Sequence, residues 1–276
     1  MQPARARLHA PRSDSRLEPG SERPAAPGSR EPAARVEDSI HVALGVPRDA
    51  DPSDDHLLDE GAYVLSYNAE RKVPNWVAWR LDASYLGHVK RRDDFRPDPL
   101  LPSGFYRVSE RDYRRSGFDR GHLCPSADRE DSLADNSSTF VFTNIVPQVH
   151  ELNAGPWEEL EKFERDRARA PGAALYIVAG GVFREPCARI GGGVAVPVAT
   201  FKIIAVLRDG ETAGDLSLDR ELYALQMPND RSVAGHDMRE FVTSVDQIEA
   251  ATGYDFLDRV PVAVQGALER RVSQLP

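Results

Sequence analysis

The charged stretch at 118–129 contains one histidine, His122, directly after an arginine and a glycine. A neutral imidazole, with an ordinary pKa of about 6.5, can accept a proton from water at physiological pH. Gly121 gives the backbone the freedom to turn and present the ring, and Arg120 carries a permanent charge that can fork onto phosphate oxygens. Asp119 does not favour a polyanion, so we expect it to orient Arg120 or the local backbone. These residue types together suit phosphodiester hydrolysis, which needs a base, a divalent cation and cationic donors.

A second set of polar residues follows this stretch. The sequence reads Thr143-Asn144-Ile145-Val146-Pro147-Gln148 and then places Asn153, Trp157, Leu160 and Glu161 downstream. Considered one at a time, these residues have ordinary structural explanations. Asn153 alone is typical of a helix cap, and Glu161 alone is typical of a solvated helix face. Their joint spacing after His122 favours a functional set.

Together these stretches resemble the DNA/RNA non-specific endonuclease family, sugar-non-specific ββα-metal nucleases whose members include mitochondrial endonuclease G. The resemblance runs from Val73 to about Leu257 and includes the segments at 226–229 and 252–256. It implies an α+β fold with a central antiparallel sheet flanked by helices and a ββα-metal finger at 117–164. His122 would lie near the end of the first strand of that finger, and Asn153 would lie on its helix.

The resemblance also implies roles for individual residues. Asn153 matches the family's metal ligand, and Glu161, rather than Glu158 or Glu159, matches the residue that bonds metal-bound water. A neutral amide oxygen suits Mg²⁺, which keeps several of its waters, and Mn²⁺ is an alternative. The implied activity is metal-dependent endonucleolytic hydrolysis of DNA and RNA, with His122 as the general base.

Three further site residues follow from the same resemblance. Arg91 is the expected phosphate-clamping arginine, although Arg92 stays open as an alternative. Asn144 is expected to hold His122 or the substrate through its amide, and Gln148 is a further candidate. Without the resemblance, the arginine run at 90–92 would be interpreted as an exposed charged turn.

The formal net charge of −9 argues against a generally basic nucleic-acid-binding surface. Basic residues nevertheless concentrate in one part of the chain, which we call the basic strip. Its members are Lys90, Arg91, Arg92, Arg96, Arg107, Arg111, Arg114, Arg115 and Arg120. A basic strip and a metal ion can attract a polyanion to an acidic protein.

Two other classes of function stay open at this point. One is a catalytically silent relative that only binds nucleic acid. The other is a zinc-stabilised interaction domain using His122, Cys124, His150 and Cys187, whose spacing fits no familiar zinc frame. We expect Cys124 to be a small buried hydrophobe, and the sequence leaves its pairing with Cys187 undecided.

The elements that must position these residues divide the chain into three parts. Residues 1–38 are rich in Arg, Pro, Ser, Glu and Ala, which predicts a disordered tail. Residues 39–72 form a lead-in segment, and 73–270 form the nuclease domain. No run is apolar enough for a membrane span or a signal peptide, so no membrane partner is expected. Export and an intracellular location both stay open, as does the oligomeric state, homodimer included.

Within the domain, β-branched and aromatic runs bounded by turn residues predict strands, and 3.6-residue periodicity predicts helices. The predicted strands are 76–81, 175–179, 201–207 and 221–227. The predicted helices are 131–140, 153–169 and 238–250, the last ending at Thr252-Gly253.

Overall fold

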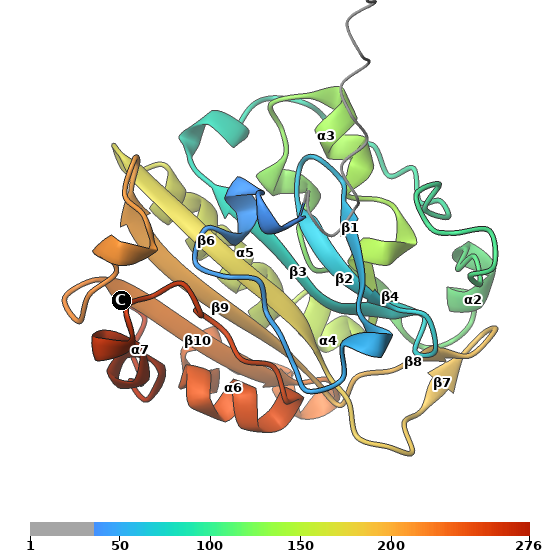
Figure 1. Ribbon diagram of the computed structural model, residues 1–276. Coiled ribbons are helices and arrows are strands. Elements are labelled where there is room, and N and C mark those ends of the chain that lie inside the picture. The colour runs from blue at the N-terminus through green and yellow to red at the C-terminus, as the bar shows by residue number, and fades with distance from the viewer. Residues whose placement is uncertain (1–35) are drawn as a thin grey trace, which may run out of the picture. The chain divides into compact units, whose positions relative to one another are not determined.

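The computed structural model describes residues 36–276 (Figure 1). Within them a seven-stranded antiparallel sheet runs in the order β1-β2-β3-β6-β9-β10-β11, and β4-β5 and β7-β8 form two small pairs. This architecture confirms the predicted α+β class with a central antiparallel sheet flanked by helices.

The strands are β1 (His56–Asp59), β2 (Val64–Asn68), β3 (Val73–Leu81), β4 (Asp119–His122), β5 (Ile145–Gln148), β6 (Ala173–Val182), β7 (Arg189–Ile190), β8 (Val194–Ala195), β9 (Ala199–Arg208), β10 (Glu221–Pro228) and β11 (Val242–Thr243). The α-helices are α2 (Glu110–Tyr113), α3 (Leu133–Ser138), α4 (His150–Asn153), α5 (Pro156–Ala168), α6 (Val245–Thr252) and α7 (Val262–Glu269). Short 3₁₀ turns include η4 (Ser126–Asp128), η5 (Phe142–Asn144) and η8 (Met238–Phe241). None of the helices within 36–276 is long and apolar enough to cross a bilayer.

The central strands separate two hydrophobic cores. All four predicted strands are confirmed, as parts of β3, β6, β9 and β10. On one sheet face, Trp79 packs with Trp157 and Leu160 of α5. On the other face, Trp76 packs with Ile248 of α6 and Leu268 of α7. Figure 1 shows α5 behind the sheet and α6 and α7 in front of it. Burial on both faces explains why these strands are mostly apolar rather than alternating, with Lys202 of β9 among the buried exceptions.

The predicted helix at 153–169 is two helices. Asn153 is the last residue of α4, and α5 begins at Pro156 after Gly155. Proline has no backbone N–H and disfavours a helical conformation in the residue before it, so it starts a helix rather than continuing one. The prediction that Asn153 begins the long helix is therefore wrong.

The other two predicted helices are shorter than expected. The segment 131–140 contains α3 only, which is capped by the Ser132 hydroxyl accepting from the Asp135 N–H. In 238–250, η8 and β11 precede α6, because Ser244 caps a new helix by accepting from the Gln247 N–H. The predicted stop is confirmed, since Gly253 ends α6 with a left-handed φ of 84°.

The structure changes the predicted boundary between the N-terminal tail and the folded body. Residues 1–35 of the expected tail lie outside the described residues. Val36, however, is fully buried in the core that contains α6, and the Glu37 carboxylate bonds Arg48. The lead-in segment supplies β1 and β2, which pair with each other and with β3. The folded body therefore includes residues 36–72.

Candidate active site

The β4-β5 pair presents the histidine and the arginine side by side. Successive strand residues face opposite sides, so Arg120 and His122 share one side of β4. On the other side a Cβ on Gly121 would lie 2.0 Å from the Gln148 Oε1 atom. Gly121 thus leaves room for the Gln148 side chain, and the expected turn at this position is not observed, because Gly121 lies within β4.

His122 lies in an enclosed aromatic environment. Its ring centroid is 5.3 Å from that of Phe95 and 4.9 Å from that of Phe140. Its Nε2 atom is buried and has no hydrogen-bond partner within 36–276. Burial, followed by the charges of Arg91 and Arg120, lowers the pKa of His122 to about 3. The ring is therefore neutral at physiological pH.

Asn144 bonds the backbone just after His122 and is not among the residues that line the cavity described below. Its Oδ1 accepts from the Cys124 N–H at 2.9 Å, and its Nδ2 donates to the Cys124 carbonyl at 2.8 Å and the Thr139 carbonyl at 2.9 Å. Trp157 of α5 adds a second tie, because its Nε1 donates to the His122 carbonyl at 3.2 Å. These bonds fix where β4 ends.

A cavity of about 290 Å³ gathers most of the predicted site residues. Five predicted residues line it, together with Pro125, Ser126, Ala127, Ala154, Glu158 and Arg165. The five are Arg91, Arg120, His122, Asn153 and Glu161. Asn144, Gln148 and Arg92 are not among its lining residues. The Gln148 amide is buried, and neither of its polar atoms has a partner within the described residues.

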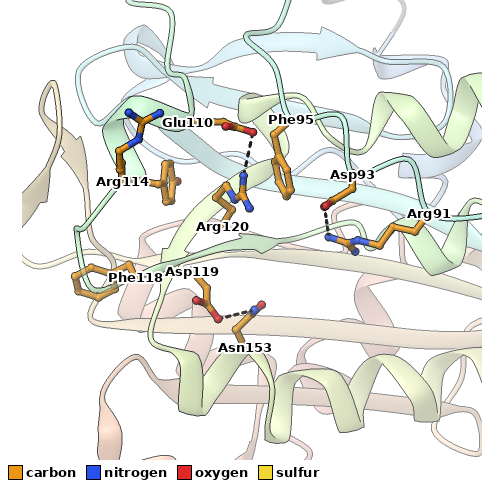
Figure 2. Close-up of a pocket in the computed structure, with 10 residues that line it drawn as sticks. Arg91, Asp93, Phe95, Glu110, Arg114, Phe118, Asp119, Arg120 and Asn153 are labelled. Carbon is orange, nitrogen blue, oxygen red and sulfur yellow. Dashed lines mark hydrogen bonds and ion pairs between the residues drawn. The ribbon is translucent and has the colours of Figure 1, made fainter.

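Asp119 contacts Asn153, not Arg120 as expected. The Asn153 Nδ2 donates to the Asp119 Oδ2 at 3.1 Å, and the His150 Nδ1 lies 2.8 Å from the same oxygen. Figure 2 shows Asp119 and Asn153 pointing toward each other. Because the Asn153 NH₂ group is engaged, its Oδ1 is the atom left for a metal ion.

Arg120 and Arg91 each carry an acidic partner and an aromatic surface. Arg120 bonds the Glu110 carboxylate at 3.1 Å, and its guanidinium lies 4.0 Å from the centre of the Phe95 ring (Figure 2). Arg91 lies 3.5 Å from the Asp93 carboxylate. It also donates to the Ser126 hydroxyl at 3.2 Å and covers the Phe140 ring at 4.8 Å.

Arg92 is placed differently from Arg91. Its backbone N–H donates to the Asn136 Oδ1 at 3.0 Å. Arg91, by contrast, also lines a second cavity of about 420 Å³, which shares Arg120 and Asn153 with the first. The same second cavity contains Arg114 of the basic strip (Figure 2).

Other members of the basic strip support loops. Arg107 donates to the Asp98 and Leu101 carbonyls, and Arg96 donates to the Ser137 carbonyl at 2.8 Å. The cations available at the cavities are therefore fewer than the sequence pattern indicates.

Glu161 lies with an arginine that the sequence analysis missed. Burial, with the Asp128 charge adding to it, raises the pKa of Glu161 to about 7, although Lys202 and Arg165 oppose the shift. Arg165 lines the same cavity, and its Nη1 is 3.9 Å from the Glu161 Oε2. The spacing of four residues on one helix was the available signal, because such residues share a face.

The donor set fits a hard divalent cation. Asn153 offers a neutral oxygen, and Glu161 offers a nearby carboxylate for hydrogen bonds from bound water. The zinc alternative finds no support in the described part of the chain. Among residues 36–276, two groups of three acidic side chains lie close enough to share an ion, and neither group includes His122, Cys124, His150 or Cys187. The groups are Asp49, Asp54 and Asp55, and Asp246, Glu249 and Glu269. Cys124 is buried and, like Cys187, free, which confirms its prediction as a buried small residue.

Comparisons with known proteins agree with this geometry. The family model described as DNA/RNA non-specific endonuclease matches residues 47–263. A nuclease from Nostoc sp. is 41% identical over 241 residues, covering 85% of this chain and 86% of that protein. Human mitochondrial endonuclease G is 31% identical over 226 residues, covering 77% of this chain and 73% of that protein. A chain from the crystal structure of the EndoG/EndoGI complex matches with a TM-score of 0.68 and 26% identity, covering 85% of this chain and 94% of that chain.

Proposed function

We infer that the cavity around His122 is a nuclease active site, because the chain belongs to the DNA/RNA non-specific endonuclease family. The protein is a non-specific endonuclease acting on DNA and RNA. The observation that carries the proposed site is the meeting of His122, Asn153 and Glu161 in one cavity with three arginines, Arg91, Arg120 and Arg165.

His122 is the general base in this proposal. The lowered pKa keeps its ring neutral, so a nitrogen lone pair is available to accept a proton from the attacking water. Nε2 is enclosed by protein, and we therefore assign the proton transfer to Nδ1. The Phe95 and Phe140 rings and the bonds at Cys124 and Trp157 hold the imidazole at the cavity.

Asn153 and Glu161 are the residues that would hold a divalent cation. Asn153 contributes Oδ1, whose direction is set by the bond from its Nδ2 to Asp119. Glu161 accepts hydrogen bonds from the waters of the ion. When bound, Mg²⁺ or Mn²⁺ supplies charge neutralisation at the scissile phosphate. The family is metal-dependent, and Mg²⁺ is our proposal for the ion.

The arginines stabilise the charge that grows on the phosphate during attack. Arg120 is on the same side of β4 as His122, which places its guanidinium beside the reacting group. Arg91 is favoured over Arg92 as the phosphate clamp, because Arg91 lines both cavities. Glu110 and Asp93 hold the two guanidinium groups until substrate replaces them.

A catalytically silent nucleic-acid-binding relative is the alternative. Such a protein would need the arginines, but it would have no use for a neutral buried imidazole beside an oriented amide. The test is plasmid nicking and RNA degradation by the purified protein in Mg²⁺, in Mn²⁺ and in EDTA. We expect cleavage of both nucleic acids with either ion and none in EDTA. Binding without cleavage would identify the silent relative, and cleavage that survives EDTA would contradict the metal-dependent mechanism.

A further inference from the structure

A buried carboxylate lies beneath the catalytic cavity without lining it. Asp128, the last residue of η4, is fully buried. Its Oδ2 accepts from the Trp79 Nε1 at 3.0 Å, and its Oδ1 accepts from the Arg165 Nη1 at 3.1 Å. The carboxylate is therefore tied to the central sheet at one oxygen and to a cavity-lining cation at the other.

Two of the buried carboxylates in this region have a cation of their own. Glu164 pairs with Lys202, whose Nζ lies 3.0 Å from its Oε1, and both side chains are fully buried. Asp128 pairs with Arg165 at 3.1 Å. The nearby buried Arg129 is committed elsewhere, because its guanidinium donates to the backbone carbonyls of Ala62, Asp128 and Arg80.

Glu161, by contrast, makes no hydrogen bond to a cation within residues 36–276. Its ion-pair partner is Arg165, whose Nη1 lies 3.9 Å from the Glu161 Oε2, which is longer than a hydrogen bond. The two residues are four apart on α5, a spacing at which a glutamate and an arginine on a helix readily pair. The same Arg165 Nη1 instead donates to the Asp128 Oδ1 at 3.1 Å.

We propose that Asp128 is a positioning residue that holds Arg165 away from Glu161, so that the Glu161 carboxylate is not occupied by an ion pair and stays open to a divalent cation and its waters in the cavity. This proposal rests on the proposed metal-dependent function. In this arrangement Asp128 and Glu161 compete for the Arg165 guanidinium. Because Asp128 holds it, the Glu161 carboxylate remains available in the cavity near Asn153. Asp128 performs this role from behind Arg165, without touching substrate or metal.

The test is the affinity of the protein for Mn²⁺, measured by calorimetry without nucleic acid. Asp128→Asn keeps an oxygen acceptor for Trp79 but removes the charge that holds Arg165. Arg165 should then pair with Glu161, and Mn²⁺ affinity should fall about tenfold, within the range usual for coupled neighbours. In Asp128→Asn/Arg165→Gln the competing cation is gone, so Mn²⁺ affinity should return to within about twofold of wild type while hydrolysis stays low.

A matched control separates positioning from a loss of packing. Trp79→Phe removes the other hydrogen bond to Asp128 and leaves every charge in place, so it should lower the melting temperature without the loss of Mn²⁺ affinity. Unchanged Mn²⁺ affinity in Asp128→Asn would overturn the proposal, as would a double variant that binds as weakly as the single one. If Asp128→Asn does not fold, the double variant, in which neither position 128 nor position 165 carries a charge, is compared with wild type, and Mn²⁺ affinity far below wild type would overturn the proposal. Wild-type protein that binds no Mn²⁺ would instead refute the metal-dependent function itself.

Discussion

The Asn153 amide is held by a single hydrogen bond to Asp119, which leaves its oxygen for a metal ion. Asn153→Ala removes that oxygen, so we expect loss of Mg²⁺ binding and of metal-dependent cleavage. Asn153→Asp still supplies an oxygen and should keep partial activity with an altered preference between Mg²⁺ and Mn²⁺. Calorimetry with each ion gives the comparison. Unaltered Mg²⁺ binding in Asn153→Ala would mean that another residue holds the ion.

The ionisation of Glu161 predicts how activity depends on pH. Its pKa is raised to about 7 by burial, so the carboxylate that accepts hydrogen bonds from metal-bound water is lost as the pH falls through that value. We expect kcat/KM at low Mg²⁺ to fall below about pH 7, and this limb to move to lower pH as Mg²⁺ is raised, because a bound cation favours the carboxylate. His122, with a pKa of about 3, does not titrate in this range.

Glu161→Gln provides the control for that profile. The amide does not ionise, so the variant should have low activity and no limb near neutral pH. A limb that persists in Glu161→Gln, or one that ignores the Mg²⁺ concentration, would show that another group controls the pH dependence.

At the scale of elements, the break between α4 and α5 sets the position of Asn153. Gly155 is the residue at the break, and a Cβ there would lie 2.3 Å from the Glu151 carbonyl oxygen of α4. Gly155→Ala must therefore move the end of α4, which carries Asn153. Overpacking of this kind costs roughly 1–3 kcal/mol, so we expect a lower melting temperature together with weaker Mg²⁺ binding.

Gly104→Ala is the matched control, because an added Cβ at Gly104 meets nothing within 4 Å. It should leave both the melting temperature and Mg²⁺ binding unchanged. If Gly155→Ala binds Mg²⁺ as the wild type does, the break is not what positions the amide.

Sequence alone identified the elements whose residues carry a strong local signal. The strands at 175–179 and 201–207 are apolar on both faces apart from Lys202, so their pattern was recognisable without tertiary information. The break before Pro156 was missed although glycine and proline mark it, because the family pattern was interpreted as one helix. The start of α6 was missed because the residues just before Ser244 form β11 rather than a helix. Only with that strand in place does Ser244 stand at the beginning of a helix and cap it.

The contacts between residues at the cavity were harder to predict than the identity of the residues that line it. The Asp119–Asn153 bond joins residues 34 apart, and the Arg165–Asp128 bond joins residues 37 apart. Both depend on how β4 and η4 pack against α4 and α5, and no spacing along the chain encodes that packing. Most of the residues that line the cavity were therefore predictable, whereas the partners that orient them were not.

At the scale of the whole molecule, the composition of the N-terminal segment and the burial of Val36 predict different outcomes for two N-terminal truncations. Residues 1–35 have a composition that does not support a packed core, so their removal should leave melting temperature and specific activity intact. Removal of 1–38 also takes away Val36, which is fully buried. Burial of such a side chain contributes about 1.5–3 kcal/mol, and its loss should lower the melting temperature by about 2–4 °C per kcal/mol.

The two truncated proteins are each other's controls in a thermal melt. A large loss of stability or activity on removing 1–35 would mean that this segment contacts the folded body. Equal melting temperatures for the two truncations would contradict the structural role given to Val36.

The formal net charge of −9 means that the protein as a whole does not attract nucleic acid. Binding and catalysis are therefore expected to depend on different residues. In the proposed mechanism, binding rests on a few arginines and a metal ion, so we expect the dependence of affinity on salt to be shallow. Cleavage depends in addition on a neutral base that makes no contribution to charge attraction. His122 is therefore the residue whose removal distinguishes the two.

The most direct measurement is single-turnover cleavage by His122→Ala in Mg²⁺, set beside nucleic-acid binding in Ca²⁺, with the exposed His236→Ala as control. A general base is typically worth about 10²–10⁴-fold in rate. The account predicts a loss of that size in His122→Ala with binding and melting temperature close to wild type, and no loss in His236→Ala. Cleavage by His122→Ala within a few-fold of wild type would contradict the assignment of His122 as the base.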